Sequence, residues 1–412
     1  MTTSVDIRSE DFLDRPVACL GALRASAPSC PVEPEGWLLI TRHDLVRRIL
    51  QDTAGFPTIR SKHQQPPAEV ADQVADIRAQ GWPYTSALGT SNPPDHTTYR
   101  KMVNKSFTPR ALQALEPLVR QAADDLARIL PNGVEIDFQA DFAEPLPVWA
   151  ISRVLGLPPE RSADIRRWST AAISTIGSSP ASADWIRYEE DLLDFQRTMV
   201  GILEASRDSD EPGLIAQLAR DLADSDDSDA SELPRLITLL RELVVAGNET
   251  TGKFIAEAVR TFGADPTVWE RIRQNPDFAE NVVEESVRMA SPTQHVIRVA
   301  ADDIDLDGTV IEKGRVVMLS LASANRDESV FPDPDAFNPD RESLRAQLAF
   351  GQGVHSCVGA GLARMESIIA LQVLAQQVDR IVPTMPAGPY TRSYIIRGPL
   401  EMRATVHRRG SR

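Results

Sequence analysis

Helical periodicity between about Asp95 and Ala290 is the feature that most constrains what this chain can fold into. Apolar residues recur there at helical spacing in four segments, residues 111–130, 184–205, 213–223 and 233–247. After Pro292 the pattern changes to the alternation typical of strands, and residues 359–380 return to a long amphipathic helix. The sequence therefore predicts a mainly α, α+β fold in which a large helical region is combined with small β-sheets.

The other segments predict shorter elements and connections. Residues 37–41, WLLIT, predict a strand, and residues 43–52 predict an amphipathic helix. Residues 53–94 are rich in Pro, Gly, Gln and small side chains, so we expect a long connection that is either functional or disordered. The acidic residues 221–232 predict a solvated loop, and the tail from Val382 predicts short strands.

The charge balance argues against nucleic-acid binding. The chain of 412 residues has a formal net charge of −15, and no basic run occurs that could neutralise phosphates. Since neither a repeat nor a composition boundary separates independent cores, residues 1–412 are expected to form a single domain.

The cysteines and the N-terminal sequence predict a cytoplasmic protein. The three cysteines, Cys19, Cys30 and Cys357, are too few and too irregularly spaced for a disulfide framework or a Cys-rich zinc site, which fits a reducing compartment. The N-terminus is polar and acidic, unlike a signal peptide. No stretch of 18 apolar residues occurs, so we expect no membrane anchor.

A glycine-rich loop around Cys357 is the most informative short segment. Residues 350–359 read FGQGVHSCVG, and the three glycines in these ten residues allow a sharp turn and a close approach to a bulky group. The predicted helix follows at once, so Cys357 lies near a helix N-terminus, where a thiolate is favoured. Two alternatives are a buried structural cysteine and a nucleophile paired with His355, for which no orienting Asn or Asp signature is found.

A polar segment interrupts the helical pattern of residues 236–262. Five of the six residues 246–251, AGNETT, are poor or modest helix formers or are polar, whereas the flanking residues are apolar. One interpretation is two helices separated by a turn at Gly247 and Asn248. The other is a single helix that is locally opened where the threonines and the glycine loosen the backbone hydrogen bonds.

The cysteine loop resembles a known family signature. Every defining position of the haem-binding signature of cytochrome P450 enzymes, F-G-x-G-x-H/R-x-C-x-G, is matched by Phe350, Gly351, Gly353, His355, Cys357 and Gly359. The resemblance implies haem b as the cofactor and Cys357 as the axial thiolate ligand of its iron, a ligand that favours O–O cleavage. It also implies that His355 contacts a haem propionate.

The interrupted helix resembles the oxygen-activation motif of the same family, A/G-G-x-D/E-T-T. This implies a single, opened helix across the distal face of the haem, which then lies between this helix and the helix after the cysteine loop. Thr250 would hydrogen-bond bound oxygen and Glu249 would connect to solvent, because a carboxylate beside a hydroxyl can relay protons through ordered water. Glu249 departs from the more frequent Asp but preserves the acid.

Glu285 and Arg288 lie three residues apart in NVVEESVRMA. Alone, this spacing predicts an ordinary exposed ion pair worth about 0.2–0.5 kcal/mol. Placed before the cysteine loop, it resembles the E-x-x-R motif of the family. The resemblance implies a buried charge cluster with a structural role, in which Arg341 is the third member. Gln347 departs from bacterial relatives, which often carry His at this position.

Several cations are candidates for contacting the haem propionates. Residues 92–100 resemble the segment that opens a haem-contacting helix in bacterial members, although ordinary surface polarity is the alternative. Arg298 matches a strand arginine that reaches a propionate. The haem-contacting residues that the resemblance implies are His96, Arg100, Ala246, Arg298, Phe350, Gly351, His355 and Gly359.

The resemblance also implies where the substrate pocket lies. Its walls would be formed by Trp82, Tyr84, Leu88, Val245, Gln294, Val296, Ile395 and Ile396. These residues indicate a small-to-medium hydrophobic substrate. Gln294 and His295 could orient one oxygenated group, but His295 is equally compatible with a position inside the sheet.

The implied activity is that of a haem-thiolate monooxygenase, which activates O2 and hydroxylates or epoxidises its substrate. The alternatives are a peroxide-using or otherwise non-monooxygenase haem-thiolate enzyme, and a non-catalytic haem-binding protein. Because the sequence contains no flavin or nicotinamide domain and no cysteine set for an iron–sulfur cluster, electrons are expected from a ferredoxin with a ferredoxin reductase. Candidates for docking that acidic partner are Lys101, Lys105, Arg345 and Arg364.

Overall fold

The computed structural model describes residues 4–59, 65–178, 180–209, 212–223, 232–385 and 389–410. The chain divides into two compact units. The first unit comprises residues 1–59, 116–144 and 250–412, and the second unit comprises residues 60–115 and 145–249. Two helices, α6 (Pro109–Ile129) and α11 (Glu232–Phe262), contribute residues to both units.

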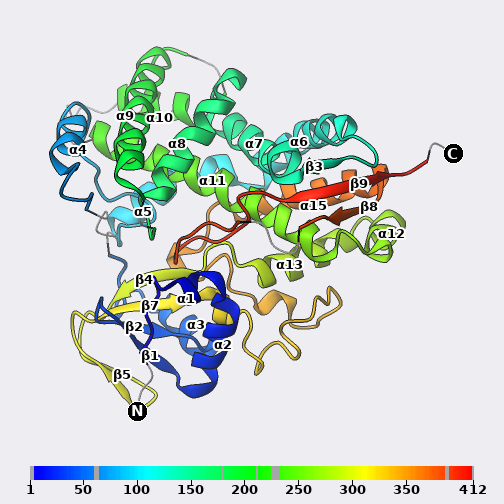
Figure 1. Cartoon of the computed structure of the whole chain (residues 1–412). Helices are drawn as coiled ribbons and strands as arrows, with labels where there is room; N and C mark the ends of the chain where they lie inside the picture. The colour runs from blue at the N-terminus through cyan, green and yellow to red at the C-terminus, as the bar shows by residue number, and fades with distance from the viewer. Residues whose placement is uncertain are drawn as a thin grey trace. The chain divides into compact units, whose positions relative to one another are not determined.

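A four-stranded sheet organises part of the first unit (Figure 1). In spatial order its strands are β1 (Ser29–Val32), β2 (Trp37–Ile40), β7 (Val316–Ser320) and β4 (His295–Val299). β2 pairs in parallel with β7, whereas the other two pairs are antiparallel. The strand predicted from WLLIT is confirmed as β2, and the helix predicted after it is α3 (His43–Gln51).

Alternating side chains give this sheet two apolar faces. On one face Val317 and Leu319 pack with the apolar side of α3. On the other face Met318 packs with apolar residues of α1 (Glu10–Asp14) and α2 (Pro16–Ser26). Because both faces are covered, the sheet fixes which side chains of β4 point to each side.

The rest of the first unit combines helices with two smaller sheets. One sheet has the order β3-β9-β8, with β3 (Glu135–Asp137), β9 (Arg403–Arg408) and β8 (Val378–Pro383). The other is a pair of antiparallel strands, β5 (Ile304–Leu306) and β6 (Thr309–Ile311). The helical elements are α12 (Pro266–Gln274), α13 (Phe278–Ala290), α14 (Leu321–Ala324), α15 (Ala360–Gln377), η2 (Gln139–Ala143), η4 (Leu344–Ala346) and η5 (Gly353–His355).

Two predicted elements of the first unit are corrected by the structure. The helix predicted over residues 359–380 ends at Gln377, because Val378 already pairs with Arg408 in the β8–β9 ladder. The strand-like pattern after Pro292 stops at β7, because the Ser320 hydroxyl accepts a hydrogen bond from the Ser323 amide at 3.1 Å and starts α14. The tail predicted as short strands contains the end of β8 and β9.

The second unit is helical wherever regular structure is described. Its elements are α4 (Ala71–Arg78), α5 (Asp95–Asn104), η1 (Lys105–Phe107), α7 (Pro145–Leu155), η3 (Pro159–Arg161), α8 (Ser162–Ser174), α9 (Ser182–Ala205) and α10 (Leu214–Ala223). The predicted connection over residues 53–94 therefore contains a helix, α4, whose Val74 packs against Trp185. Residues 224–231, most of the predicted acidic loop, lie outside the described residues.

The structure of α11 distinguishes the two interpretations of the polar segment, one continuous helix or two helices separated by a turn. It runs as one α-helix from Glu232 to Phe262 and includes the polar segment at residues 246–251, so the two-helix alternative is wrong. The Asn248 side-chain amide donates to the Val244 carbonyl at 3.0 Å and to the Ser169 hydroxyl at 2.8 Å, which satisfies a buried polar group.

The predicted mainly α, α+β fold with small sheets is confirmed. Within the described part of the chain, no helix combines the length and apolar character that a membrane span requires.

Candidate functional site

The loop around Cys357 is closed by backbone hydrogen bonds. The Gly351 amide donates to the Leu348 carbonyl and the Cys357 amide donates to the Phe350 carbonyl, both at 2.8 Å. Gly351 and Gly353 have φ values of 64° and 74°, in the left-handed region that favours glycine. At Gly353 a Cβ atom would also lie only 2.6 Å from the Leu50 carbonyl oxygen, so the chain cannot turn here with a larger residue.

Cys357 lies directly before the first turn of α15. Gly359 caps this helix, and the Ala360 amide donates to the Cys357 carbonyl at 3.4 Å. The thiol is exposed and forms no disulfide, so the alternative of a buried structural cysteine is wrong. The partial positive charge at a helix N-terminus stabilises negative charge on a sulfur placed there. The geometry therefore suits a thiolate ligand.

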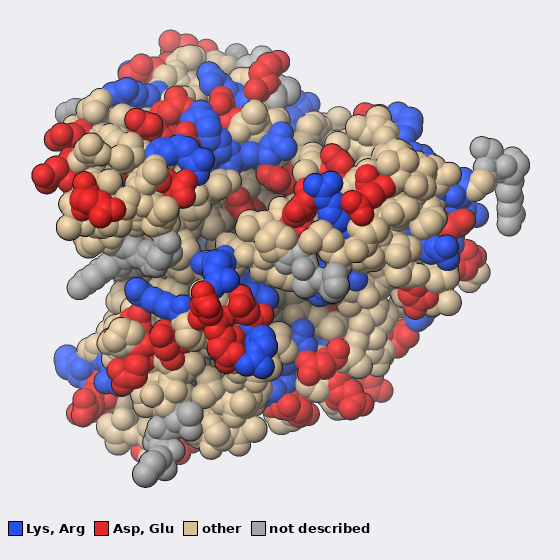
Figure 2. All heavy atoms as spheres, viewed as in Figure 1, with Lys and Arg blue, Asp and Glu red and all other residues tan. Residues whose placement is uncertain are grey.

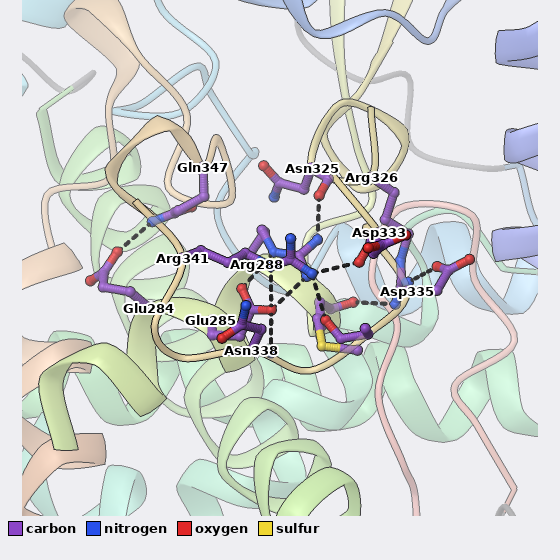
Figure 3. A network of polar contacts seen from close by, with 12 residues as sticks. Glu284, Glu285, Arg288, Asn325, Arg326, Asp333, Asp335, Asn338, Arg341 and Gln347 are labelled. Atoms are coloured by element: carbon purple, nitrogen blue, oxygen red, sulfur yellow. Dashed lines mark hydrogen bonds and ion pairs between the residues drawn. The ribbon is translucent and has the colours of Figure 1, made fainter. Parts of the chain in front are cut away.

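A buried charge cluster lies at the end of α13 (Figure 3). Glu285 and Arg288 are both 0% exposed, and their side chains form two hydrogen bonds, at 2.7 and 2.8 Å. Arg341 donates from Nε to Glu285 at 2.9 Å and from its terminal nitrogens to the Pro332, Asp333 and Ala336 carbonyls. The exposed pair that the spacing alone predicts is thus wrong, because two cations share one buried carboxylate.

Asn325, which Figure 3 shows beside the charge cluster, connects this cluster to the cysteine loop. The Asn325 carbonyl accepts a hydrogen bond from Arg288 at 2.7 Å, and its side-chain oxygen accepts one from the Leu348 amide at 2.6 Å. Because Leu348 in turn bonds Gly351, a continuous set of hydrogen bonds runs from Arg288 to the beginning of the loop. The cluster therefore supports the loop that carries Cys357.

A second set of contacts holds the residues before Phe350. The Gln347 side chain donates to Glu284 at 3.0 Å and accepts from the Ala349 amide at 2.7 Å. Arg364 of α15 pairs with the same Glu284 and places its guanidinium 4.2 Å from the centre of the Phe350 ring. Gln347 is thus an integral part of the loop support, and the charge of Arg364 is balanced by an adjacent acid.

Arg298 is a buried cation on β4. Its exposed fraction is 6%, and it forms no ion pair among the described residues. Its guanidinium donates a hydrogen bond to the Ile297 carbonyl at 2.8 Å. Burial lowers the pKa of the guanidinium to about 10. A buried charge without a counter-charge is costly, so this position suits an anionic ligand group.

His96 and Arg100 share a face of α5 in the second unit. His96 is buried, and burial together with the charge of Arg100 lowers the pKa of its imidazole. An anion beside this pair would relieve the repulsion between the two groups. His355, another candidate contact, ends η5 in the first unit.

The polar segment of α11 has two distinct sides. Asn248 and Thr251 are buried, whereas Ala246 is exposed and Glu249 and Thr250 are half-buried. Glu249 and Thr250 are consecutive residues of one continuous helix. The acid and the hydroxyl are therefore both accessible, which proton transfer to solvent requires.

Within the described residues no group of three or more His, Cys, Asp or Glu side chains could hold a metal ion.

Comparison with known proteins identifies the family. Residues 230–383 match the sequence model described as Cytochrome P450. The vitamin D(3) 25-hydroxylase from Pseudonocardia autotrophica is 32% identical over 416 residues, which cover 98% of this chain and 97% of that protein. The chain belongs to the cytochrome P450 family.

Two further comparisons agree. Cytochrome P450 109 from Bacillus spizizenii is 39% identical over 296 residues, or 70% of this chain and 71% of that P450. The structure of cytochrome P450 CYP109Q5 from Chondromyces apiculatus has a TM-score of 0.80 at 29% identity and covers 100% of both chains. The predicted P450 fold and the predicted enzyme class, a P450 monooxygenase, are confirmed.

Membership of the P450 family implies a haem-iron cofactor, and the described residues fit it. Cys357 offers an exposed thiol at a helix N-terminus, the kind of sulfur that can bind iron as thiolate. Arg298 offers a buried cation that has no carboxylate partner among the described residues. Both belong to the first unit.

The eight residues predicted to line the P450 substrate pocket are divided between the units. Trp82, Tyr84, Leu88 and Val245 belong to the second unit, and Gln294, Val296, Ile395 and Ile396 belong to the first. Trp82 and Tyr84 line a cavity of about 260 Å³ in the second unit. The Gln294 side chain is used by backbone groups, because it donates to the Ser291 carbonyl at 2.6 Å. It is therefore not directed at a substrate.

His295 lies inside the sheet. Its Nδ1–H donates to the Tyr394 carbonyl at 2.5 Å, and its ring packs near Phe12, on the face of the sheet that α1 and α2 cover. Val296, the next residue of β4, packs on the opposite face. Of the two predicted positions for His295, the one inside the sheet is therefore correct.

Acidification is expected to destabilise this P450 through His295. Burial lowers the pKa of its imidazole to about 4, so the unfolded chain binds a proton near pH 6.5 and the folded chain does not. Stability is then full above about pH 6.5 and falls as the pH drops toward 4, by about 2 kcal/mol between pH 7 and 5. Urea unfolding at the two pH values measures it. His295→Asn keeps a donor near Tyr394 without titrating, and an equal pH-dependent loss in this variant would contradict the assignment.

The structural roles of three residues were not predicted from the sequence. Asn325 and Gln347 support the cysteine loop, and Glu366 lies on α15 two turns beyond its start. Glu366 is 1% exposed, neither of its carboxyl oxygens has a partner among the described residues, and burial raises its pKa well above the usual range. The sequence contains a pattern that could have identified Glu366 as a buried acid, because Glu366 interrupts an otherwise apolar stripe of the helix.

Proposed function

We propose that this P450 is a haem-thiolate monooxygenase that uses O2 to hydroxylate or epoxidise a small-to-medium hydrophobic substrate. One observation carries the proposal. Cys357 is exposed at the start of α15, on a loop that a buried charge cluster supports through Asn325. Such a support holds a ligand in place before the cofactor binds, which a metal centre needs in order to keep its ligand orientation.

Haem b is the proposed cofactor. Cys357 would bind its iron, and the other haem contacts would be His96, Arg100, Ala246, Arg298, Phe350, Gly351, His355 and Gly359. When bound, the haem supplies the activation of O2 and the transfer of one oxygen atom to the substrate. The buried Arg298 supports an anionic cofactor, because a propionate beside it would compensate a charge that has no acid partner among the described residues.

Glu249 and Thr250 are the proposed catalytic residues. Both are half-buried, so each can exchange protons with groups on the accessible side of α11. The Glu249 carboxyl would take protons from solvent, and the Thr250 hydroxyl would donate one and regain it from Glu249, directly or through a water molecule. This order of transfer keeps protons supplied to the reacting oxygen while the rest of the pocket stays apolar.

Thr250→Ala is expected to divert electrons from product to hydrogen peroxide, because the hydroxyl that passes protons is lost. Product formed per reducing equivalent consumed should fall on the order of tenfold or more. The measurement is the ratio of product to peroxide with any substrate that is turned over. Thr250→Ser keeps a hydroxyl and is the matched control. An unchanged ratio in Thr250→Ala would assign proton delivery to another group and favour peroxide-type chemistry.

The hydrophobic substrate class is supported by the apolar character of Leu88, Val245 and Val296. A relative with 32% identity over nearly the whole chain is named for the hydroxylation of vitamin D(3), a hydrophobic molecule. A panel of terpenoids, steroids, fatty acids and aromatic compounds, scored by the change in the haem absorption band, would identify the class.

A ferredoxin with its reductase is the proposed electron source. Lys101, Lys105 and Arg345 are exposed cations that could contact an acidic ferredoxin. Arg364 is less suited to this role because it pairs with Glu284. The face in Figure 2 shows Lys and Arg interspersed with Asp and Glu rather than a continuous basic surface.

The cytoplasm is the proposed location, and residues 1–412 are proposed to act as one catalytic domain. None of the three cysteines, which all lie among the described residues, forms a disulfide, as is usual in a reducing compartment. The continuity of α6 and α11 supports the single domain, because each helix contributes residues to both units.

A further inference from the structure

We infer that Gln196 and Glu242 are positioning residues that fix the segment Trp82–Thr90 as a wall of the substrate pocket and so determine which substrates fit. The inference rests on the proposed function, because this segment carries the pocket candidates Trp82, Tyr84 and Leu88. Every group involved belongs to the second unit.

The segment has no secondary structure of its own that would hold it. Residues 82–87 form neither helix nor strand, and a turn follows at residues 88–90. Its position is therefore set by contacts with other elements rather than by backbone ladders. The segment, α4 and α9 together line a cavity of about 260 Å³, to which the segment contributes Trp82 and Tyr84.

Gln196 of α9 fixes the beginning of the segment. Its side-chain oxygen accepts from the Trp82 amide at 2.9 Å, and its side-chain nitrogen donates to the Trp82 carbonyl at 3.0 Å. Gln196 is 4% exposed, so the side chain that makes both bonds is itself buried. A Cβ atom at Gly81 would lie 2.1 Å from the Gln196 oxygen, so glycine at this position allows the close approach.

Glu242 of α11 fixes the end of the segment. One carboxylate oxygen accepts from the Gly89 amide at 2.9 Å, and the other lies 3.5 Å from the Thr90 hydroxyl. That hydroxyl also accepts from the Ala87 amide at 3.1 Å. Glu242 therefore holds the turn around Leu88, whose side chain is 8% exposed.

Neighbouring residues of α11 contact the middle of the segment. The Thr85 amide donates to the Thr238 hydroxyl at 3.2 Å, and the Arg241 guanidinium lies 3.9 Å from the centre of the Tyr84 ring. Residues 238, 241, 242 and 245 are spaced at i, i+3, i+4 and i+7, so they share one face of the helix. Val245, another residue predicted to line the pocket, therefore lies on the same face of α11 as the residues that contact the segment.

Loss of the contacts from Gln196 or Glu242 is expected to weaken the binding of any ligand that packs against the segment. The apparent dissociation constant increases by the reciprocal of the fraction of molecules in the competent arrangement. If loss of one anchor leaves that arrangement populated about a tenth of the time, binding weakens about tenfold. Ligands that do not reach the wall keep their affinity.

The test uses two probes on the haem-loaded enzyme. Imidazole can coordinate iron without reaching the pocket wall, whereas 4-phenylimidazole adds a phenyl ring that must fit within the pocket. Glu242→Leu and Gln196→Leu should each weaken 4-phenylimidazole about tenfold and change imidazole less than about twofold, as measured by spectral titration. Glu242→Gln keeps an acceptor for the Gly89 amide and should restore binding. Glu190→Leu changes an exposed residue of α9 and is the control.

Amide hydrogen exchange over residues 82–90 provides a readout that does not depend on haem chemistry. Exchange should increase by about tenfold or more in the two leucine variants and remain at the wild-type rate in Glu242→Gln. Unchanged exchange in both leucine variants would overturn the inference. Increased exchange with unchanged 4-phenylimidazole binding would overturn the role in specificity. If the wild-type enzyme instead lacks thiolate-ligated haem, the proposed function fails, while the exchange result still decides whether the two anchors hold the segment.

Discussion

Glu285→Ala is expected to destabilise the protein by about 3–5 kcal/mol, because it leaves two cations without their shared counter-charge. Arg288 is 0% exposed and takes both of its acid contacts from Glu285, and Arg341 also donates to this carboxylate. In addition, the Asn338 amide loses its acceptor, which lies 2.9 Å away. Because Arg288 also bonds Asn325, the damage should extend to the cysteine loop. Haem content should therefore fall together with stability.

The matched control is Asp340→Ala, which removes an ion pair of the same chemistry at the surface. Asp340 pairs with Arg271 at 2.8 Å, and both side chains are about half exposed. Its loss is expected to cost less than about 1 kcal/mol. Urea unfolding and haem absorbance of the purified variants measure both effects. Equal losses of stability in Glu285→Ala and Asp340→Ala would contradict the prediction, because the buried cluster would then contribute no more to the free energy of unfolding than a surface ion pair.

Cys357→Ser is expected to abolish oxygenation while the polypeptide stays folded. Cys357 forms no disulfide and serine is similar in size, so the unfolding midpoint of the haem-free polypeptide should change little. A serine hydroxyl does not ionise near neutral pH and cannot act as the thiolate that promotes O–O cleavage. Product formation should fall to the background rate, with any retained haem showing an altered absorption band.

Cys19→Ser is the control for this prediction. Cys19 is a free thiol that is half-buried against α1, near Asp11, and no proposed step uses it. The variant should keep wild-type turnover and the wild-type spectrum. Turnover retained in Cys357→Ser, or lost equally in both variants, would remove Cys357 from the proposed site.

Local spacing explains what the sequence could predict about the site. Cys357 and its glycines lie within ten residues, and Glu285 and Arg288 lie one helical turn apart, so each group forms wherever its own segment folds. Helical periodicity likewise predicted α9 and most of α11, because long amphipathic patterns persist in the folded chain. Boundaries were less predictable, as α14 shows, where one serine cap ended a strand-like pattern.

Contacts between distant segments explain what the sequence could not predict. Asn325 reaches Leu348, Gln347 reaches Glu284, and Gln196 reaches Trp82. A polar residue in a sequence has many equally plausible partners, and only tertiary packing selects one. The same limit applied to His295, since its two alternative positions differ by which face of β4 is buried against α1 and α2.

The measurement that tests the central claim most directly is the absorption spectrum of the dithionite-reduced, haem-loaded protein with carbon monoxide. A thiolate opposite carbon monoxide shifts the Soret band strongly to the red, and this shift is the result that Cys357 ligation predicts. An unshifted haem band would contradict it and would mean a protonated thiol or another ligand. Failure to bind haem at all would contradict both the cofactor and the proposed monooxygenase activity.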